Sequence, residues 1–134
     1  MFSRLFSRTT AVHAHCDLPC GVYDPAQAKI EADSVLAICK KYADSTDEAF
    51  RTRAIVIKEQ RSELVKHHLW VLWTDYFKPP HFEKYPQLHQ LFNEATKLAG
   101  GGGGTKSSTD VATAEELLAK IDDISKIFWE TKQG

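Results

Sequence analysis

Apolar residues recur every three or four positions along four segments of this chain, and no segment alternates in the manner of a β-strand. Such spacing places apolar side chains on one face of a helix. The first helix should begin at Asp24-Pro25, because Asp suits the N-cap and Pro the first helical position. Its inward face is expected to comprise Ala28, Glu31, Val35, Ile38 and Tyr42.

The second helix should be longer and run from about Asp47 to Phe77. Pro79 and Pro80 follow it, and neither can continue a helix. The steps of four and three predict an inward face made of Phe50, Ala54, Ile57, Arg61, Leu64, His68 and Val71.

A third helix is expected after Pro86, with Leu88, Leu91, Phe92, Ala95 and Leu98 inward. The glycine run at 100–104 predicts a flexible loop. The last helix should start between 108 and 113, where Thr113 and Glu116 could form a capping box. Its inward face is expected to comprise Leu117, Ile121, Ile124 and Phe128. These segments predict an all-α fold, an antiparallel up-down-up-down four-helix bundle.

The size and net charge of the chain limit the classes of protein to which it can belong. Its 134 residues are one domain in size. A net charge of -1 argues against a nucleic-acid binder, which normally carries a basic excess. Since no run of about 18 apolar residues occurs, we expect no membrane span.

Residues 1–14 differ in composition from the rest of the chain. They contain Arg4, Arg8 and four Ser or Thr residues but no acid, and they end in "AVHA". This composition resembles an organelle leader, and the small residues suit a processing protease. We therefore expect a removable leader or propeptide at 1–14 and a folded domain at 15–134; the alternative is an uncleaved, frayed N-terminus.

Two charged residues, Glu31 and Arg61, lie on faces that should be buried. A buried charge is costly unless it is paired, so the two are expected to meet across an antiparallel hairpin. The alternative is that both lie at the margin and reach water. His68, on the same face as Arg61, is expected to be a core histidine rather than a ligand.

The stretch "HCDLPC" allows several chemistries. Cys16 and Cys20 could form a disulfide or, with His13 and His15, a cramped zinc site. Their spacing does not match a thioredoxin motif. A cut after Ala14 would free the amine of His15, and nitrogen with thiolate donors suits Ni(II) or Cu(II). Cys39 is expected to be a small buried residue on a helix.

Four stretches of the chain closely resemble nickel superoxide dismutases. They are "HCDLPCGVYDPAQAKIEA" at 15–32, "TRAIVIKEQRSELVKHH" at 52–68, "DYFKPPHFEKYPQLHQL" at 75–91 and "KIFWETK" at 126–132. The resemblance covers essentially everything after Ala14 and favours the nickel interpretation of the cysteines.

The resemblance implies a set of metal ligands and supporting residues. It assigns nickel to an N-terminal hook formed by His15, through its amine and imidazole, Cys16, through its amide and thiolate, and Cys20, through its thiolate. Glu31 would hydrogen-bond the axial imidazole of His15, and Arg61 would support Glu31.

The resemblance also assigns the substrate-facing residues. Tyr23 would stand over the open face of the metal, Tyr76 would lie near it, and Lys78 would draw in the anion. The reaction implied converts superoxide to oxygen and hydrogen peroxide, with nickel alternating between (III) and (II).

The resemblance further implies a homohexamer and cleavage by a leader-processing protease. A cytoplasmic location is expected, with plastid or mitochondrion as the alternative if the leader is a transit peptide. Two rivals remain: a non-catalytic module that stores or delivers nickel or copper, and a helical interaction protein with a Cys16–Cys20 disulfide.

Overall fold

The computed structural model describes residues 21–133, and their regular structure is entirely helical. The elements are α2 (Ala26–Asp44), α3 (Glu48–Val71), the π-helix η1 (Leu72–Tyr76), α4 (Pro79–Lys84), α5 (Leu88–Leu98) and α6 (Val111–Gln133). This confirms the predicted all-α class. None of the helices in this part of the chain has the length and apolarity needed to cross a membrane.

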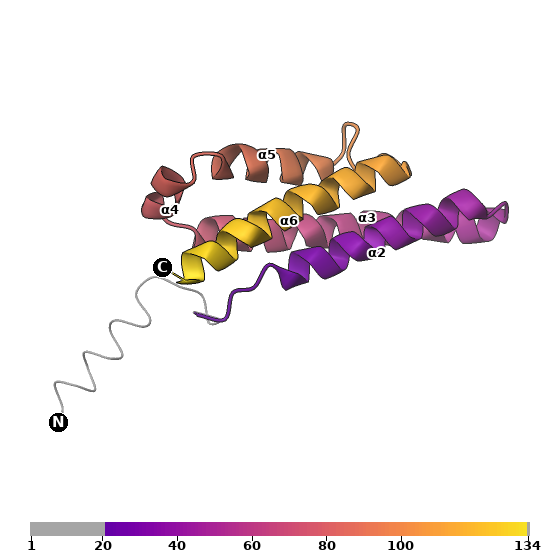
Figure 1. Cartoon of the computed structure of the whole chain (residues 1–134). Helices are drawn as coiled ribbons and strands as arrows, with labels where there is room; N and C mark the ends of the chain where they lie inside the picture. Colours follow the sequence, from indigo (N-terminus) through magenta and orange to yellow (C-terminus); the bar gives the residue numbers. More distant parts are fainter. Residues whose placement is uncertain (1–20, 134) are drawn as a thin grey trace, which may run out of the picture.

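The four long helices form a bundle in which successive helices run in opposite directions (Figure 1). Helix α2 packs on α3 and α6, and α5 packs on α6 and α3, so each helix has two neighbours. The core between them is apolar and fully shielded; its largest apolar side chains include Leu69, Leu88, Leu117, Ile121, Ile124 and Phe128.

Aspartates begin the first and last helices of the described part. The Asp24 Oδ1 accepts a hydrogen bond from the Ala26 amide at 2.8 Å, and α2 begins one residue after Pro25. Helix α6 begins at Val111, where Asp110 Oδ1 accepts from the Ala112 amide at 3.2 Å. The predicted capping box of Thr113 and Glu116 is therefore wrong, because Asp110, three residues before Thr113, accepts from the first turn of the helix.

Ala54 is buried, as predicted, but from Ile57 onward the buried face of α3 is displaced by one position from the predicted face. Phe50, Arg61 and Leu64 are exposed. The buried side chains are Ala54, Lys58, Ser62, Val65 and Leu69. One residue is a rotation of about 100° around a helix, so the polar residues Lys58 and Ser62 point inward instead.

The α5–α6 loop explains why polar side chains are buried on α3. The Lys58 ammonium donates to the carbonyl oxygens of Thr105 and Lys106. The Ser62 and Thr105 hydroxyls are 2.8 Å apart in a buried hydrogen bond. The loop therefore packs on α3 through polar contacts, which an apolar pattern does not register.

The glycine run at 100–104 forms a hydrogen-bonded turn rather than the flexible loop that its composition predicts. The Lys106 amide donates to the Gly100 carbonyl at 3.0 Å. Gly102 and Gly103 have φ of 61° and 99°, in the region that favours glycine. A Cβ on Gly104 would lie 2.5 Å from the carbonyl oxygens of Gly100 and Lys97, so this position has no room for a side chain.

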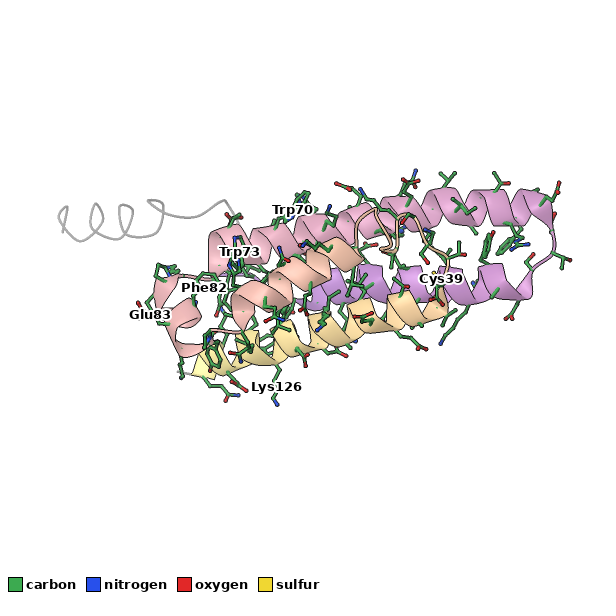
Figure 2. All side chains as sticks on the ribbon, turned by 90° about the horizontal axis from the view of Figure 1, so that it is seen from above. Cys39, Trp70, Trp73, Phe82, Glu83 and Lys126 are labelled. Carbon is green, nitrogen blue, oxygen red and sulfur yellow. The ribbon has the colours of Figure 1, made fainter. Side chains whose placement is uncertain are left out.

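The segment around Pro79 and Pro80 ends one helix, as predicted, and also begins another. The Phe77 amide donates to the Leu72 carbonyl at 2.9 Å, five residues back, as in a π-helix. Helix α4 then starts at Pro79 and covers one end of the bundle (Figure 1). Trp73 and Phe82 lie side by side at this end, with ring centroids 4.7 Å apart (Figure 2).

Candidate functional site

Tyr23 and Tyr76, the two tyrosines expected to face the substrate, lie next to each other at the end of the bundle where α4 lies. Tyr23 precedes α2, and Tyr76 is the last residue of η1. Their ring centroids are 6.0 Å apart at an interplanar angle of 58°. Both rings pack against the main apolar core, so the core fixes the position of the pair.

The hydroxyl of Tyr76 is held by α6. Its oxygen lies 2.6 Å from the Thr131 Oγ1, and that hydroxyl donates to the Phe128 carbonyl at 2.5 Å. Because a threonine hydroxyl has one proton, Tyr76 must be the donor to Thr131. The Lys132 ammonium lies 5.1 Å from the centroid of the Tyr76 ring, which favours its position through a cation–π contact.

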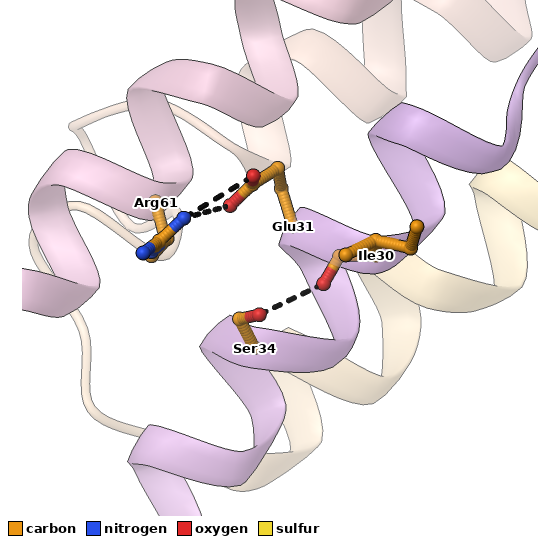
Figure 3. A network of polar contacts seen from close by, with 4 residues as sticks. All are labelled: Ile30, Glu31, Ser34 and Arg61. Atoms are coloured by element: carbon orange, nitrogen blue, oxygen red, sulfur yellow. Dashed lines mark hydrogen bonds and ion pairs between the residues drawn. The ribbon is translucent and has the colours of Figure 1, made fainter.

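Glu31 of α2 and Arg61 of α3 form the ion pair that the sequence predicts (Figure 3). The Arg61 Nη1 lies 3.2 Å from Oε1 and 3.0 Å from Oε2 of Glu31. The Glu31 side chain is 15% exposed and that of Arg61 44%, so the arginine covers the carboxylate from the solvent side. The pairing is confirmed, and Arg61 also reaches water.

His68 lies further along α3 and is half-buried. Burial lowers the pKa of His68, the neighbouring His67 lowers it further, and the charge of Glu31 opposes both. The two imidazole rings are 5.4 Å apart, edge to face. The predicted core histidine is therefore at the margin of the core, within the electrostatic reach of Glu31.

Lys78 is exposed and occupies the N-cap position of α4. Its backbone amide donates to the Nδ1 of His81 at 3.1 Å. The His81 ring stacks on Tyr76 with centroids 5.7 Å apart and an angle of 12° between planes. Burial, together with the charge of Lys78, lowers the pKa of His81.

His81 was not among the residues predicted from the sequence. Its one sequence signal is its place three residues after Lys78, with two prolines between them. Only the fold shows that its ring lies against Tyr76.

The expected metal ligands His15, Cys16 and Cys20, and the leader at 1–14, lie outside the described residues. Within residues 21–133, no group of three or more His, Cys, Asp or Glu side chains is arranged to hold a metal ion. Cys39 is fully buried, as predicted, and burial raises the pKa of its thiol. A protonated thiol is a poor metal ligand.

Comparisons with known proteins agree with these features. A profile described as nickel-containing superoxide dismutase matches residues 10–132. The curated superoxide dismutase (Ni) of Streptomyces coelicolor is 61% identical over 134 residues, 100% of both chains. The protein of the same name from Streptomyces seoulensis is 62% identical over the same length, again 100% of both chains.

Solved structures give the same likeness. A native nickel superoxide dismutase structure has a TM-score of 0.83 and 62% identity, covering 90% of this chain and 100% of that chain. A structure of a nickel-containing superoxide dismutase with nickel ligation corresponding to the oxidised state has a TM-score of 0.84 and 63% identity, with the same coverage.

Proposed function

The chain belongs to the nickel-containing superoxide dismutases, and on that premise we propose that it is completed by removal of residues 1–14, so that His15, Cys16 and Cys20 bind the nickel. The enzyme converts two superoxide anions and two protons to oxygen and hydrogen peroxide, with nickel as its cofactor. The ligands and the supporting residues are the proposal.

The donor set fits nickel chemically. The N-terminal amine and imidazole of His15 and the thiolates of Cys16 and Cys20 combine nitrogen and sulfur donors, which suit Ni(II) in a tetragonal arrangement. When bound there, nickel supplies a one-electron couple that both accepts an electron from superoxide and returns one to it.

Glu31 carries the proposal on the described side of the site. A carboxylate has about four lone-pair positions, and Arg61 approaches both oxygens through one nitrogen. Glu31 therefore keeps an acceptor for the imidazole N–H of His15. Such a hydrogen bond orients the ring and raises its basicity, while Arg61 holds the Glu31 carboxylate in place.

The two tyrosines are proposed to order small molecules beside the metal. Because the Tyr76 proton is given to Thr131, the Tyr76 oxygen can only accept from a water or a protonated peroxide. Tyr23 lies on the segment that follows the proposed ligands, and we propose that its side chain would lie beside the metal that they would hold. Together the two rings would exclude larger ligands from the metal.

Lys78 is proposed to raise the encounter rate with superoxide. Its ammonium is exposed, and a cation near the opening of a site attracts anionic substrate. Added salt should therefore lower kcat/KM, and less so in a Lys78→Ala variant.

The test compares three chains: the full sequence, a chain beginning at His15, and a control beginning at Ala14. Superoxide consumption, nickel content and intact mass are measured for each. Only the chain beginning at His15 should bind nickel and turn over, because a single extra residue converts the amine into a peptide nitrogen. Equal activity of the control would contradict the proposed ligand set.

We further propose a homo-oligomer, as a homohexamer, and a cytoplasmic location with 1–14 acting as a propeptide. Exposed apolar side chains support the first, including Ile55, Val56, Trp70 and Trp129. Sedimentation of the processed protein measures the subunit number.

The location and the protease are tested separately. Residues 1–14 fused to a fluorescent protein distinguish a propeptide from a plastid or mitochondrial targeting sequence. Co-expression with candidate proteases identifies the one that removes residues 1–14.

A further inference from the structure

We propose that His81 is a positioning residue that fixes Lys78 and Tyr76 together at the opening of the site. This rests on the proposed attraction of superoxide by Lys78. It adds a residue to those that the resemblance assigns to the site. The carrying observation is that one imidazole contacts the backbone of Lys78 and the ring of Tyr76.

The contact with Lys78 has the form of a capping interaction. Lys78 is the N-cap of α4, Pro79 and Pro80 are the first two helical residues, and His81 is the third. In a capping box the third residue, usually Glu or Gln, accepts from the N-cap amide. Here the His81 Nδ1 takes that place at 3.1 Å. The bond fixes the backbone from which the Lys78 side chain projects.

The contact with Tyr76 uses the flat face of the same ring. The two planes are 12° apart, and the His81 ring also meets the Phe77 ring edge to face at 5.7 Å. Tyr76 is held from the other side by the Thr131 hydroxyl. His81 therefore joins the loop that carries Lys78 to a tyrosine anchored on α6.

The hydrogen bond also defines the form of the ring. Since Nδ1 accepts, it carries no proton, and the ring proton lies on Nε2. Burial and then the positive charge of Lys78 lower the pKa of His81, which favours this neutral form. An imidazolium could not accept from the Lys78 amide.

Two substitutions separate the acceptor from the ring. His81→Gln keeps an acceptor at the third helical position but loses the stacked ring. His81→Phe keeps the ring but loses the acceptor. Each is made alone and in the Lys78→Ala background. For each processed protein, kcat/KM is measured at low and high ionic strength, with nickel content and melting temperature recorded alongside.

If His81 acts through Lys78, Lys78→Ala lowers kcat/KM about tenfold at low salt, and His81→Phe loses a large part of the same factor and of the salt dependence. The double variant His81→Phe, Lys78→Ala then has the same kcat/KM as Lys78→Ala alone, because the effects of coupled residues are not additive. His81→Gln retains most of the wild-type salt dependence.

Three results would overturn the inference: losses that multiply in the double variant, wild-type salt dependence in His81→Phe, or loss of salt dependence in His81→Gln. If His81→Phe does not fold, the salt dependence of His81→Gln alone tests the inference. An inactive wild-type protein would instead contradict the proposed function. This outcome is distinct, because the failures of the inference all require an active wild type.

Discussion

Among residues 21–133, the carboxylate of Glu31 is bonded by Arg61. Its side chain is largely shielded, and a single arginine nitrogen lies within 3.2 Å of both oxygens. An exposed ion pair contributes little, because water and salt screen it. A shielded carboxylate that loses its partner keeps the cost of desolvation without the compensating bonds. The arginine therefore matters more to Glu31 than its own exposed position suggests.

Replacing Arg61 with Met should lower turnover and reduce the free energy of unfolding by about 1 kcal/mol, since Glu31 loses its charged donor. Urea unfolding and superoxide consumption measure the two effects. Asp122→Asn is the matched control: the Lys29–Asp122 pair has the same 3.0 Å separation but both side chains are exposed. That control should cost less than about 0.5 kcal/mol. Equal losses would show that shielding does not decide the effect.

For individual residues, the sequence allowed the Glu31–Arg61 ion pair to be predicted but not the role of His81. Glu31 and Arg61 were predicted to pair because each was a charge on a face expected to be apolar, and the pair forms although Arg61 lies on an exposed side of α3. His81 offered no such mismatch, and its role depends on Tyr76 being folded back against it. The ligands His15, Cys16 and Cys20 were predicted from a motif and stay predictions.

At the scale of elements, the helices follow from periodicity, but the orientation of α3 does not. The pattern placed Leu64 inward, whereas Ser62 and Lys58 are buried. The reason is that the face of α3 is covered by the polar backbone of the α5–α6 loop. The spacing of apolar residues cannot identify a buried helix face that packs against backbone carbonyl oxygens, because polar side chains occupy such a face.

The same loop makes a prediction about its glycines. Gly104→Ala should destabilise the protein by about 2 kcal/mol or more, because the new Cβ would overlap the carbonyl oxygens of Gly100, Lys97 and Leu98. Gly101→Ala is the control, since nothing lies within 4 Å of its Cβ position. The control should change stability by less than about 0.5 kcal/mol. Thermal unfolding of both variants tests this prediction. Equal melting temperatures for Gly104→Ala and Gly101→Ala would mean that the loop rearranges to accommodate the new Cβ.

At the scale of the whole molecule, two half-buried histidines should make the bundle sensitive to acid. Burial lowers the pKa of both His68 and His81 below the ordinary value of 6.5. The unfolded chain therefore binds protons first as the pH falls below that value, so stability decreases until the folded pKa is passed. The free energy of unfolding, measured from pH 7.5 down to pH 5, should fall.

The double variant His68→Gln and His81→Gln should flatten that decrease. The pKa values of Glu63 and Glu94 are also lowered, by hydrogen bonds from Lys106 and Lys120, but their stabilisation is lost only at more acidic pH. Keeping the measurements above pH 5 separates the two effects. An unchanged slope in the double variant would assign the acid sensitivity to other groups.

Nickel should stabilise the molecule only after processing. If the freed amine of His15 and the two thiolates hold the metal in the folded protein, binding adds about 2.7 kcal/mol at a free nickel concentration of 100 times Kd. The full-length chain lacks that amine and should show no nickel-induced shift. Melting temperature is measured for both forms with and without nickel, and a Tyr23→Phe variant of the processed form serves as a control with all ligands present. A nickel-induced shift of the same size in the full-length chain would mean that the metal is bound without the N-terminal amine.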